Sequence, residues 1–470
     1  MPGFFVKNFG CRATQADGAA IERELAERGL HRAGSPAEAD VVVLNTCTVT
    51  AAADQDARAA IRRVHRANPN TKILVTGCYA QRAPQEVSAL PGVTWVVGNS
   101  HKHKVAEIAT GAQPSNFVSL DSVALSSPPF TLVGDIFAHT ELVAASVFAS
   151  DDIASRTRPN LKVQDGCNNR CSFCIIPSVR GQSRSMKLGR VLEEANALVA
   201  AGYREVVLSG INLGRWGRDF APQMTFTQLV RALLDHTDVE KIRISSVEPM
   251  DWTDELIALV ATTSRIAKHA HLPLQSGSDR ILRAMHRKYR PWHYAEKLRK
   301  IREAMPDAAI GADVMVGFPG ETDGLFEESR SFIERLPFTY LHVFTYSSRP
   351  GTPSAAMPNQ VPVELSRERN KILRDLAARK NLEFRRSFVG RTLEVITLQN
   401  GDAESTEALS DNYLKTRVSG QHSANTWMQV SITGIESDDL AGLKVRRGSA
   451  ASLRCKPSPR EDRSLAMIST

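Results

Sequence analysis

The sequence predicts an α/β chain of three folded parts: an N-terminal parallel α/β domain, a partial (β/α)6 barrel of the TIM type, and a small C-terminal β-barrel. Strand-like and helix-like segments alternate over residues 1–100 and again from residue 161 to 345, as in parallel sheets covered by helices. After residue 388, short strand-like segments alternate with Gly and Asn turns, as in small β-barrels. A chain of 470 residues also exceeds the size of one ordinary core.

The composition is that of a soluble globular protein, with 42% hydrophobic and 23% charged residues. The N-terminus reaches Lys7 after three apolar residues, and no apolar run approaches the roughly 18 residues of a membrane span. We therefore expect a cytoplasmic protein without a membrane partner. The seven cysteines are an odd number scattered along the chain, which favours reduced thiols or metal ligands over disulfides.

Three cysteines follow predicted strands of the N-terminal domain. We expect strands near Phe4–Phe9, Ala39–Asn45, Lys72–Thr76 and Val93–Val97, and helices over about Asp17–Arg28 and Ala52–Arg66. Cys11, Cys47 and Cys78 each come just after a strand. Read singly, each is more often a small buried hydrophobe. Because parallel strands end at the same edge of a sheet, the three thiols should converge into one three-cysteine cluster site.

A segment of fading periodicity, residues 113–152, is expected to be a linker with some strand character. The regular pattern then resumes. Barrel strands are expected near Leu161–Gln164, Glu205–Leu208, Lys241–Ser245, His269–Leu272, Ala309–Val316 and Tyr340–Phe344. Helices are expected over Lys187–Ala201, Thr225–Leu234, Thr253–Thr262, Arg280–Arg287, Tyr294–Ala304 and Leu325–Leu336.

The loop after the first barrel strand holds Cys167, Cys171 and Cys174 in the spacing C-x3-C-x2-C. A structural zinc site and a ferredoxin-type 4Fe-4S cluster each use four protein ligands, so three cysteines suggest a cluster with one iron left open to a substrate. The alternative is a set of buried or zinc-binding cysteines completed by a distant His. Three of seven cysteines within eight residues favour the open cluster.

The other barrel strands also deliver candidate residues to their carboxyl ends, where such barrels bind ligands. Ser209 and Gly210 would let the backbone approach a ligand closely, although glycine after a strand is often only a turn. Glu248 and Gln275 could accept hydrogen bonds from a ligand or could cap helices. Gly317 opens a tight turn before a helix N-terminus, a place suited to polar or anionic groups.

Two segments carry most of the positive charge of a chain whose net charge is +8. Residues 154–190 contain eight Lys/Arg and one acid, and residues 265–303 contain eleven Lys/Arg and three acids. Beside one cleft they would form a phosphate-binding surface for nucleic acid. The alternative is two solvated helix faces.

The C-terminal region begins with a basic amphipathic helix, Pro362–Arg386. Strands are expected at Thr392–Leu398, Thr416–Ser419, Met428–Thr433 and Gly442–Val445, and the tail that holds Cys455 should be disordered. The expected domains are residues 1–112, a linker 113–152, a barrel core 153–384, a β-barrel 385–450 and a tail 451–470.

Several motifs together resemble the radical S-adenosylmethionine (SAM) methylthiotransferase family over nearly the whole chain. Besides the three-cysteine loop they are Phe9-Gly-Cys11, Asn45-Thr-Cys47-Thr-Val-Thr50, Thr76-Gly-Cys78-Tyr-Ala-Gln81, Leu274-Gln-Ser-Gly277, Val316-Gly-Phe-Pro-Gly-Glu-Thr322 and Ser410-Asp-Asn-Tyr413. The second and third look most like the MtaB branch, which modifies threonylcarbamoyladenosine in tRNA. One departure is Thr14, where relatives usually carry Asn, followed by Ala16-Asp17-Gly18 in place of a more usual Tyr-Glu pair.

The resemblance implies a radical SAM core, a C-terminal TRAM domain, SAM and two 4Fe-4S clusters. Cys167, Cys171 and Cys174 would hold the catalytic cluster, and Cys11, Cys47 and Cys78 the second. It implies that SAM is cleaved to a radical that removes hydrogen from C2 of the adenine, and that a methylthio group then takes its place. The expected SAM contacts are Phe173, Ser209, Gly210, Glu248, Gln275 and Gly317.

The implied partners are the anticodon stem-loop of tRNA and an electron donor such as flavodoxin or ferredoxin. Alternative substrates are isopentenyladenosine in tRNA and ribosomal protein S12. A different class of function is an RNA-binding iron–sulfur protein without turnover, or an electron carrier. An electron carrier would need neither an open iron nor ligand-binding residues at six strand ends.

Overall fold

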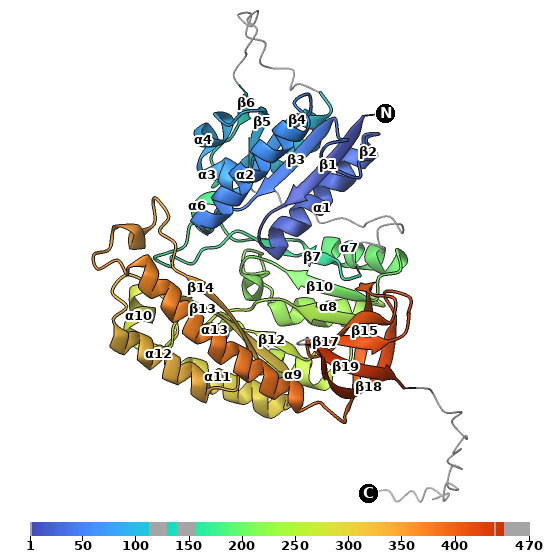
Figure 1. The fold of residues 1–470 in the computed structure, drawn as a ribbon, viewed down its shortest axis with the longest axis vertical. Helices are drawn as coiled ribbons and strands as arrows, with labels where there is room; N and C mark the ends of the chain where they lie inside the picture. The colour runs from blue at the N-terminus through green and yellow to red at the C-terminus, as the bar shows by residue number, and fades with distance from the viewer. Residues whose placement is uncertain (1, 112–128, 139–156, 437–438, 446–470) are drawn as a thin grey trace, which may run out of the picture.

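The computed structural model describes residues 2–111, 129–138, 157–436 and 439–445. Figure 1 shows the N-terminal α/β domain above a half-barrel, with a small closed β-barrel beside the half-barrel. The predicted α/β fold class, with its three folded parts, is therefore confirmed. The predicted tail 451–470 and most of the predicted linker lie outside the described residues. No helix within the described residues is long and apolar enough to cross a membrane.

The N-terminal sheet is parallel throughout, in the order β2-β1-β3-β4-β5-β6. Its strands are β1 (Gly3–Asn8), β2 (His31–Arg32), β3 (Val41–Thr46), β4 (Lys72–Gly77), β5 (Val93–Gly98) and β6 (Phe130–Leu132). The connecting helices are α1 (Arg12–Glu27), α2 (Ala51–Ala67), α3 (Cys78–Arg82), α4 (Pro84–Ser88), η1 (Asn99–Lys104) and α5 (Val105–Ala109). Strand β6 comes from the segment expected to be a linker.

Helix α1 begins at Arg12, five residues before the start that periodicity predicts. The signal is weak because Ala13, Ala16 and Gly18 are small, and glycine is a poor helix former. Glycine suits position 18 nevertheless: a Cβ there would lie 1.8 Å from Oδ1 of Asn8 at the end of β1 and would displace this amide from its hydrogen bond with Asn45. The early start places the whole turn after Cys11 on helical backbone against the sheet.

The half-barrel consists of two three-stranded parallel sheets, β11-β10-β7 and β12-β13-β14. Its strands are β7 (Asn160–Lys162), β10 (Glu205–Ser209), β11 (Lys241–Ile244), β12 (His269–His271), β13 (Ala309–Val316) and β14 (Tyr340–Thr345). Isolated bridges at Ile242–Ile266 and Ser246–His271 join the sheets, so the six strands follow chain order. After β7, β8 (Gln164–Asp165) pairs antiparallel with β9 (Arg184–Ser185), and α6 (Ile176–Arg180) lies between them in sequence.

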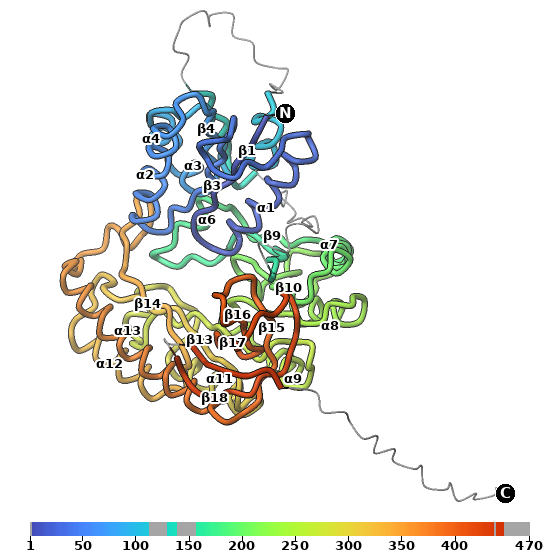
Figure 2. Tube along the Cα trace, turned by 45° about the vertical axis from the view of Figure 1, so that its right-hand side comes forward, coloured from blue at the N-terminus to red at the C-terminus, as the bar shows by residue number. Residues whose placement is uncertain are grey.

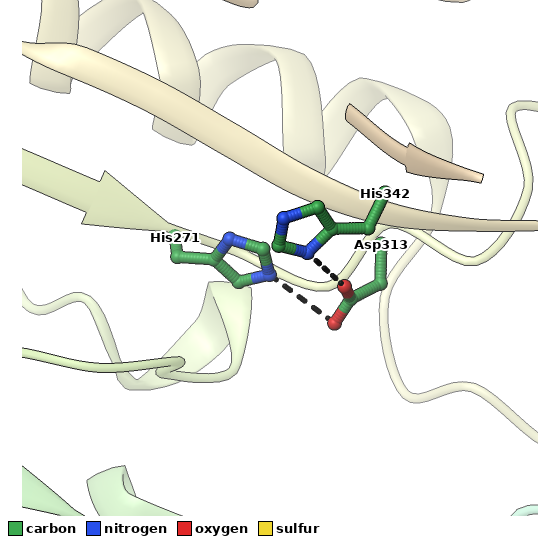
Figure 3. Close-up of side chains that lie close together, drawn as sticks. All are labelled: His271, Asp313 and His342. Carbon is green, nitrogen blue, oxygen red and sulfur yellow. Dashed lines mark hydrogen bonds and ion pairs between the residues drawn. The ribbon is translucent and has the colours of Figure 1, made fainter. Parts of the chain in front are cut away.

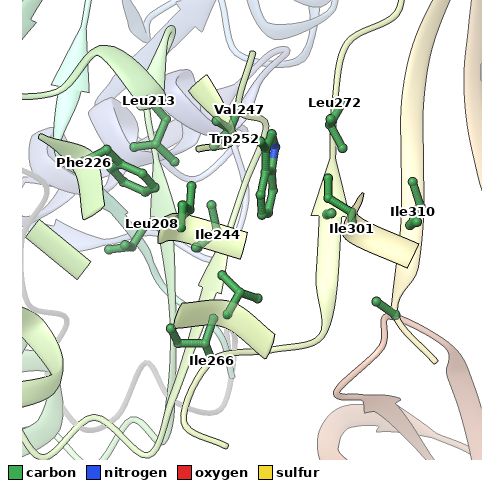
Figure 4. Packing of buried hydrophobic residues seen from close by; sticks show 14 of the residues in the cluster. Leu208, Leu213, Phe226, Ile244, Val247, Trp252, Ile266, Leu272, Ile301 and Ile310 are labelled. Carbon is green, nitrogen blue, oxygen red and sulfur yellow. The ribbon is translucent and has the colours of Figure 1, made fainter. Parts of the chain in front are cut away.

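Helices cover the outside of the half-barrel: α7 (Leu188–Ala200), α8 (Phe226–His236), α9 (Asp254–Thr262), α10 (Asp279–Ala284), α11 (Pro291–Ala304), α12 (Asp323–Arg335) and α13 (Val363–Arg386). Figure 4 shows Leu208, Ile244 and Ile310 of three strands, with Trp252 and Ile301, in one buried apolar cluster. Each such side chain contributes about 1.5–3 kcal/mol when fully buried. This core fixes the positions of the strand ends, where the candidate ligand-binding residues lie.

The C-terminal barrel closes in the order β15-β16-β17-β19-β18. Its strands are β15 (Thr392–Gly401), β16 (Ser405–Ser410), β17 (Lys415–Ser419), β18 (Trp427–Glu436) and β19 (Asp439–Lys444). The sequence predicted four of the five strands. Strand β16 was missed because its residues are mostly small or polar, although Ala408 and Leu409 are buried.

Figure 2 shows β15, β16 and β17 of this barrel lying against the half-barrel. Arg243 of β11 attaches the two parts through hydrogen bonds. Its guanidinium binds the Glu205 carboxylate through Nε at 2.6 Å and donates to the carbonyl oxygens of Ser410 and Asp411 at 3.2 and 2.9 Å. Burial alone would raise the pKa of Glu205, but Arg243 lowers it below the ordinary value. The buried Arg243–Glu205 ion pair therefore also provides hydrogen-bond donors for two backbone carbonyl groups of the neighbouring domain.

A cluster of buried charges joins the N-terminal domain to the half-barrel. Asp17 accepts hydrogen bonds from Lys102 Nζ at 2.8 Å, from Arg180 Nη2 at 3.1 Å and from Lys162 Nζ. Asp165 binds Arg180 Nη1 through both carboxylate oxygens at 3.0 Å. Burial alone would raise the pKa of Asp17, but these three cations hold it well below the ordinary carboxyl value. We call these five residues the interface charge cluster.

A second ionic contact crosses the same boundary. Asp54 of α2 binds Arg82 Nη2 at 3.1 Å and also binds Arg349, which follows β14. Thr48 donates a hydrogen bond to Asp54 and accepts one from Arg82 Nε at 2.8 Å. The loop after β3, which holds Cys47, is thereby tied to the half-barrel.

Asp17→Asn should destabilise the protein strongly, because three buried cations would lose their shared anion. We expect a loss of about 3–5 kcal/mol at neutral pH, the range for breaking a buried ion pair. The control Glu27→Gln removes an exposed partner of Arg23 in the same helix and should change stability by less than about 1 kcal/mol. Thermal unfolding of the two variants measures the difference.

The pH dependence gives a second check on Asp17. A carboxyl group whose pKa is lowered on folding stabilises the folded state above its unfolded pKa of about 4, and this stabilisation is lost as the pH falls. The advantage of the wild type over Asp17→Asn should therefore shrink below about pH 5. An advantage that grows in acid would contradict the ionised Asp17.

Arg243→Ala should loosen the C-terminal barrel and leave the buried Glu205 carboxylate without its main partner. We expect a loss of about 3–5 kcal/mol. Arg204→Ala, which removes a half-exposed ion pair with Glu240 nearby, should have a small effect. Hydrogen exchange of β16 and β17 should increase in the first variant only, and equal protection in both would refute this role of Arg243.

Candidate active site

The first candidate site lies at the carboxyl edge of the N-terminal sheet. Cys47 follows the last residue of β3, and Cys78 follows the last residue of β4, which pairs with β3 at Thr46–Gly77. Cys11 follows β1 by three residues, and a Cβ at Gly10 would lie 2.9 Å from Cys47 Sγ. Gly10 also has φ of +94°, so glycine is required for this approach. The three thiols, the N-terminal triad, thus lie at one edge.

The second candidate site is the loop between β8 and α6. It holds Cys167, Cys171 and Cys174, all half-buried free thiols, which we call the loop triad. Cys174 donates its backbone N–H to the Cys171 carbonyl at 3.1 Å, so the last two cysteines share one turn. Ile175, the next residue, packs with Cys78 in one buried cluster. The segment that follows the loop triad therefore packs against the N-terminal triad at the domain boundary.

Nitrogen donors surround the sulfur atoms of both triads. Asn99 Nδ2 donates to Cys78 Sγ at 3.4 Å, Asn212 Nδ2 to Cys167 Sγ at 3.6 Å, and Arg287 Nη1 to Cys171 Sγ at 3.2 Å. Such donors stabilise negative charge on sulfur and tune the potential of iron–sulfur clusters. The donor set therefore suits thiolate ligands of a cluster.

Burial disfavours the thiolate form of three of these cysteines. Burial raises the pKa of Cys47 to about 12, with further contributions from Cys78 and Cys11, and burial likewise raises the pKa of Cys174 to about 12. Burial also raises the pKa of Cys167. Metal ligation needs thiolates, so metal binding at either triad must release protons.

The positions expected to contact SAM lie around the loop triad. Ser209 ends β10, and its buried Oγ has no hydrogen-bond partner among the described residues. The same holds for Oε1 of Gln275, which has φ of +67°. A Cβ at Gly210 would lie 3.0 Å from Oε1 of Gln164, so the backbone at this position can approach Gln164 closely only because glycine has no side chain. Buried polar atoms normally have hydrogen-bond partners, so the unpaired oxygen atoms of Ser209 and Gln275 indicate a polar ligand. SAM has the polar groups that such a ligand needs.

The remaining expected contacts are more fully engaged within the chain. Glu248 accepts a hydrogen bond from Arg287, and the Gly317 amide donates to Glu321 Oε2 at 2.7 Å. The side chain of Phe173 packs against the cluster of Met285, Met315 and Phe318. Gly317 therefore shapes its turn through an internal bond, and the α12 N-terminus is capped separately by Thr322.

Arg287 lies differently from the surface that the charge count suggested. It is buried, because α10 ends at Ala284 instead of Arg287 and His286 turns the chain with φ of +57°. Arg283 remains exposed and pairs with Asp279. Arg287 therefore contacts the loop triad through Cys171. It does not belong to the nucleic-acid surface expected from residues 265–303.

A groove and a cavity both border Arg12, the residue that follows Cys11 in the chain. The interdomain groove, about 520 Å³, lies between β1, the start of the half-barrel and β15, and its basic residues are Lys7, Arg12 and Arg158. The barrel cavity, about 90 Å³, is mostly polar; its lining includes Arg12, Ser245, Ser246, His271, Asp313 and Tyr413. Arg12 lines both spaces.

Figure 3 shows His271, Asp313 and His342 together at this cavity. His271 Nε2 lies 3.2 Å from Asp313 Oδ2, and His342 Nδ1 lies 3.3 Å from Oδ1. Their ligand atoms lie within 4.8 Å of one another. Burial alone would raise the pKa of Asp313, but the two imidazoles lower it below the ordinary value. Asp313 is thus an ionised group whose two oxygens both face imidazole rings.

Sequence reasoning missed Asn99, Asn212, Arg12 and Arg180, and it assigned Arg287 to a nucleic-acid surface instead of to the cysteine loop. The first two stand just after β5 and β10, so their position at strand ends was an available signal. The arginines carry no such signal, because their partners lie far away in sequence. Arg180, for example, contacts Thr14 at 3.2 Å across 166 residues.

Comparisons with known proteins agree with this arrangement. Residues 3–98 match the family described as Uncharacterized protein family UPF0004, and residues 161–333 match the Radical SAM superfamily. The threonylcarbamoyladenosine tRNA methylthiotransferase MtaB of Bacillus subtilis is 38% identical over 423 residues, covering 87% of this chain and 89% of that protein. A tRNA-2-methylthio-N(6)-dimethylallyladenosine synthase of Thermobifida fusca is 38% identical over 84% of this chain and 77% of its own length.

A solved structure shares the fold. The radical S-adenosylmethionine methyltransferase TsrM of Kitasatospora setae, with tryptophan and a SAM analogue bound, superposes with a TM-score of 0.53 at 16% identity and covers 75% of each chain. At this identity the likeness concerns the fold alone. Two relatives at 38% identity, matched over most of their own length, establish more. The chain therefore belongs to the methylthiotransferase family of radical SAM enzymes.

Proposed function

We propose that this chain is a tRNA methylthiotransferase that inserts a methylthio group at C2 of N6-threonylcarbamoyladenosine beside the anticodon. The observation that carries the proposal is the presence of two cysteine triads at one domain boundary, where Ile175, the residue after Cys174, packs with Cys78. The radical SAM methylthiotransferases use SAM and 4Fe-4S clusters. Two separate triads suit an enzyme that makes a radical at one cluster and delivers sulfur from another.

In this proposal Cys167, Cys171 and Cys174 hold the catalytic 4Fe-4S cluster, and Cys11, Cys47 and Cys78 hold the second. When bound, the clusters and SAM supply radical formation and sulfur transfer, chemistry that no side chain provides. The protein's own residues position these groups. Asn99, Asn212 and Arg287 donate to ligand sulfurs. Ser209 Oγ and Gln275 Oε1, which have no partner among the described residues, are available for hydrogen bonds to SAM.

The proposed substrate rests on the relatives and on the polarity of the barrel cavity. Relatives named for threonylcarbamoyladenosine and for dimethylallyladenosine match this chain at the same 38% identity. The threonylcarbamoyl group carries a urea, a hydroxyl and a carboxylate, whereas the dimethylallyl group is a hydrocarbon. A cavity lined by Arg12, Ser246, His271 and Asp313 suits the former.

We further propose the anticodon stem-loop as the RNA partner and a flavodoxin or ferredoxin as the electron donor. Lys7 and Arg158 in the interdomain groove supply cations for phosphates. The closed β-barrel borders the groove through Leu398, Gln399 and Asn400, so it can contact the stem as the expected TRAM domain. We place the domain boundaries close to residues 112, 153 and 385.

Substitutions in the two triads should separate the two halves of the reaction. Cys47→Ala should halve the iron content of about eight per chain and abolish methylthio transfer while SAM cleavage to 5′-deoxyadenosine persists. Cys171→Ala should also halve the iron content but lose both products. Cys455→Ala, outside both triads, is the control and should keep the full iron content and both activities. Iron analysis and mass spectrometry of digested tRNA measure these outcomes.

Circular dichroism must first show that each variant is folded. A folded Cys47→Ala protein that forms the methylthio product at the wild-type rate would refute the role of the N-terminal triad. Wild-type protein that saturates at about four irons would refute two clusters. Protein that never produces 5′-deoxyadenosine from SAM and dithionite would favour a non-catalytic RNA-binding protein.

A further inference from the structure

Arg12 stands where the interdomain groove opens into the barrel cavity. It is the residue after Cys11 and the first residue of α1, and it lines both spaces. Its Nη1 donates to Asn160 Oδ1 at 3.2 Å, and Asn160 in turn donates to Gln15 Oε1 at 3.2 Å. The guanidinium is therefore held at this junction by one neutral amide, Asn160, which is itself held by Gln15.

The charge balance of the barrel cavity leaves Arg12 as an uncompensated cation. Arg243 is neutralised by Glu205, and both oxygens of Asp313 face the imidazoles of His271 and His342. Arg12 forms no ion pair within the part of the chain that the structure describes. A half-buried guanidinium with free donors binds carboxylates well, because its planar fork matches their two oxygens.

The barrel cavity also lies deeper in the half-barrel than the positions expected to contact SAM. In three half-barrel units, its lining residues come before the expected SAM contacts in the chain: Ser246 precedes Glu248 by two residues, His271 precedes Gln275 by four, and Asp313 precedes Gly317 by four. The cavity therefore lies closer to the amino ends of the strands than the expected SAM contacts do. Room of about 90 Å³ accommodates several atoms of a polar chain but not a nucleoside.

We infer that the barrel cavity receives the N6 side chain of the target adenosine and that Arg12 binds the carboxylate of that side chain. This inference rests on the proposed function and adds the residue that selects an anionic substituent over a hydrocarbon one. The charge of Asp313 disfavours a second carboxylate on the cavity floor, so the substrate carboxylate stays at the mouth beside Arg12. The adenine then lies in the groove next to Cys11.

Binding of three anticodon stem-loop RNAs to the cluster-loaded full chain tests the inference. The first carries threonylcarbamoyladenosine, the second an analogue in which threoninol replaces threonine and removes the carboxylate, and the third unmodified adenosine. Wild-type protein should bind the first about tenfold more tightly than the second, the scale of one charge-assisted contact. Arg12→Gln should abolish this preference, and Arg12→Lys should retain part of it.

Lys7→Gln is the matched control, because Lys7 lines the groove but not the cavity. It should weaken binding of all three RNAs equally and lower the salt dependence by about one counterion. A folded, iron-loaded Arg12→Gln protein that keeps the wild-type preference would overturn the inference and leave the proposed function intact. Wild-type protein that binds all three RNAs equally would overturn both the inference and the proposed substrate. The wild-type comparison needs no variant, so it holds even if Arg12→Gln misfolds.

Discussion

The interface charge cluster is the constraint on which the rest of the structure depends. Asp17 and Asp165 supply two negative charges to the three cations Lys102, Lys162 and Arg180, all of them buried. Such a group is stable only when every charge has its partners in place, because a buried charge without a partner costs several kcal/mol. The N-terminal domain and the half-barrel are therefore fixed in one relative position.

This cluster is also linked electrostatically to the cysteines. Burial alone would lower the pKa of Arg180, but Asp165, Cys78, Asp17 and Cys11 together raise it well above the ordinary value. The cluster has one positive charge in excess, and thiolates of the N-terminal triad would offset it. Metal binding at that triad and closure of the domain interface should therefore stabilise each other.

The sequence predicted features set by local pattern and missed those set by distant partners. Cys47 and Cys78 could be placed together because successive parallel strands end at one edge. The start of α1 at Arg12 could not be predicted, because it depends on how Gly18 fits against Asn8. The predicted exposure of Arg287 was also wrong, because counting charges cannot distinguish an arginine on a solvated helix face from a buried arginine that donates to Cys171.

The geometry of α1 connects these observations. Its first residue is Arg12, it is preceded directly by Cys11, and Asp17 lies five residues after Arg12. A helix is a rigid element with a fixed rotation and rise per residue, so anchoring Asp17 among three cations fixes the direction of Arg12 as well. A shift of the helix by one residue would move Asp17 out of the interface charge cluster and leave those cations unpaired. The ion pairs that hold the two domains together therefore also set the positions of Cys11, the proposed cluster ligand, and of Arg12, the proposed carboxylate-binding residue.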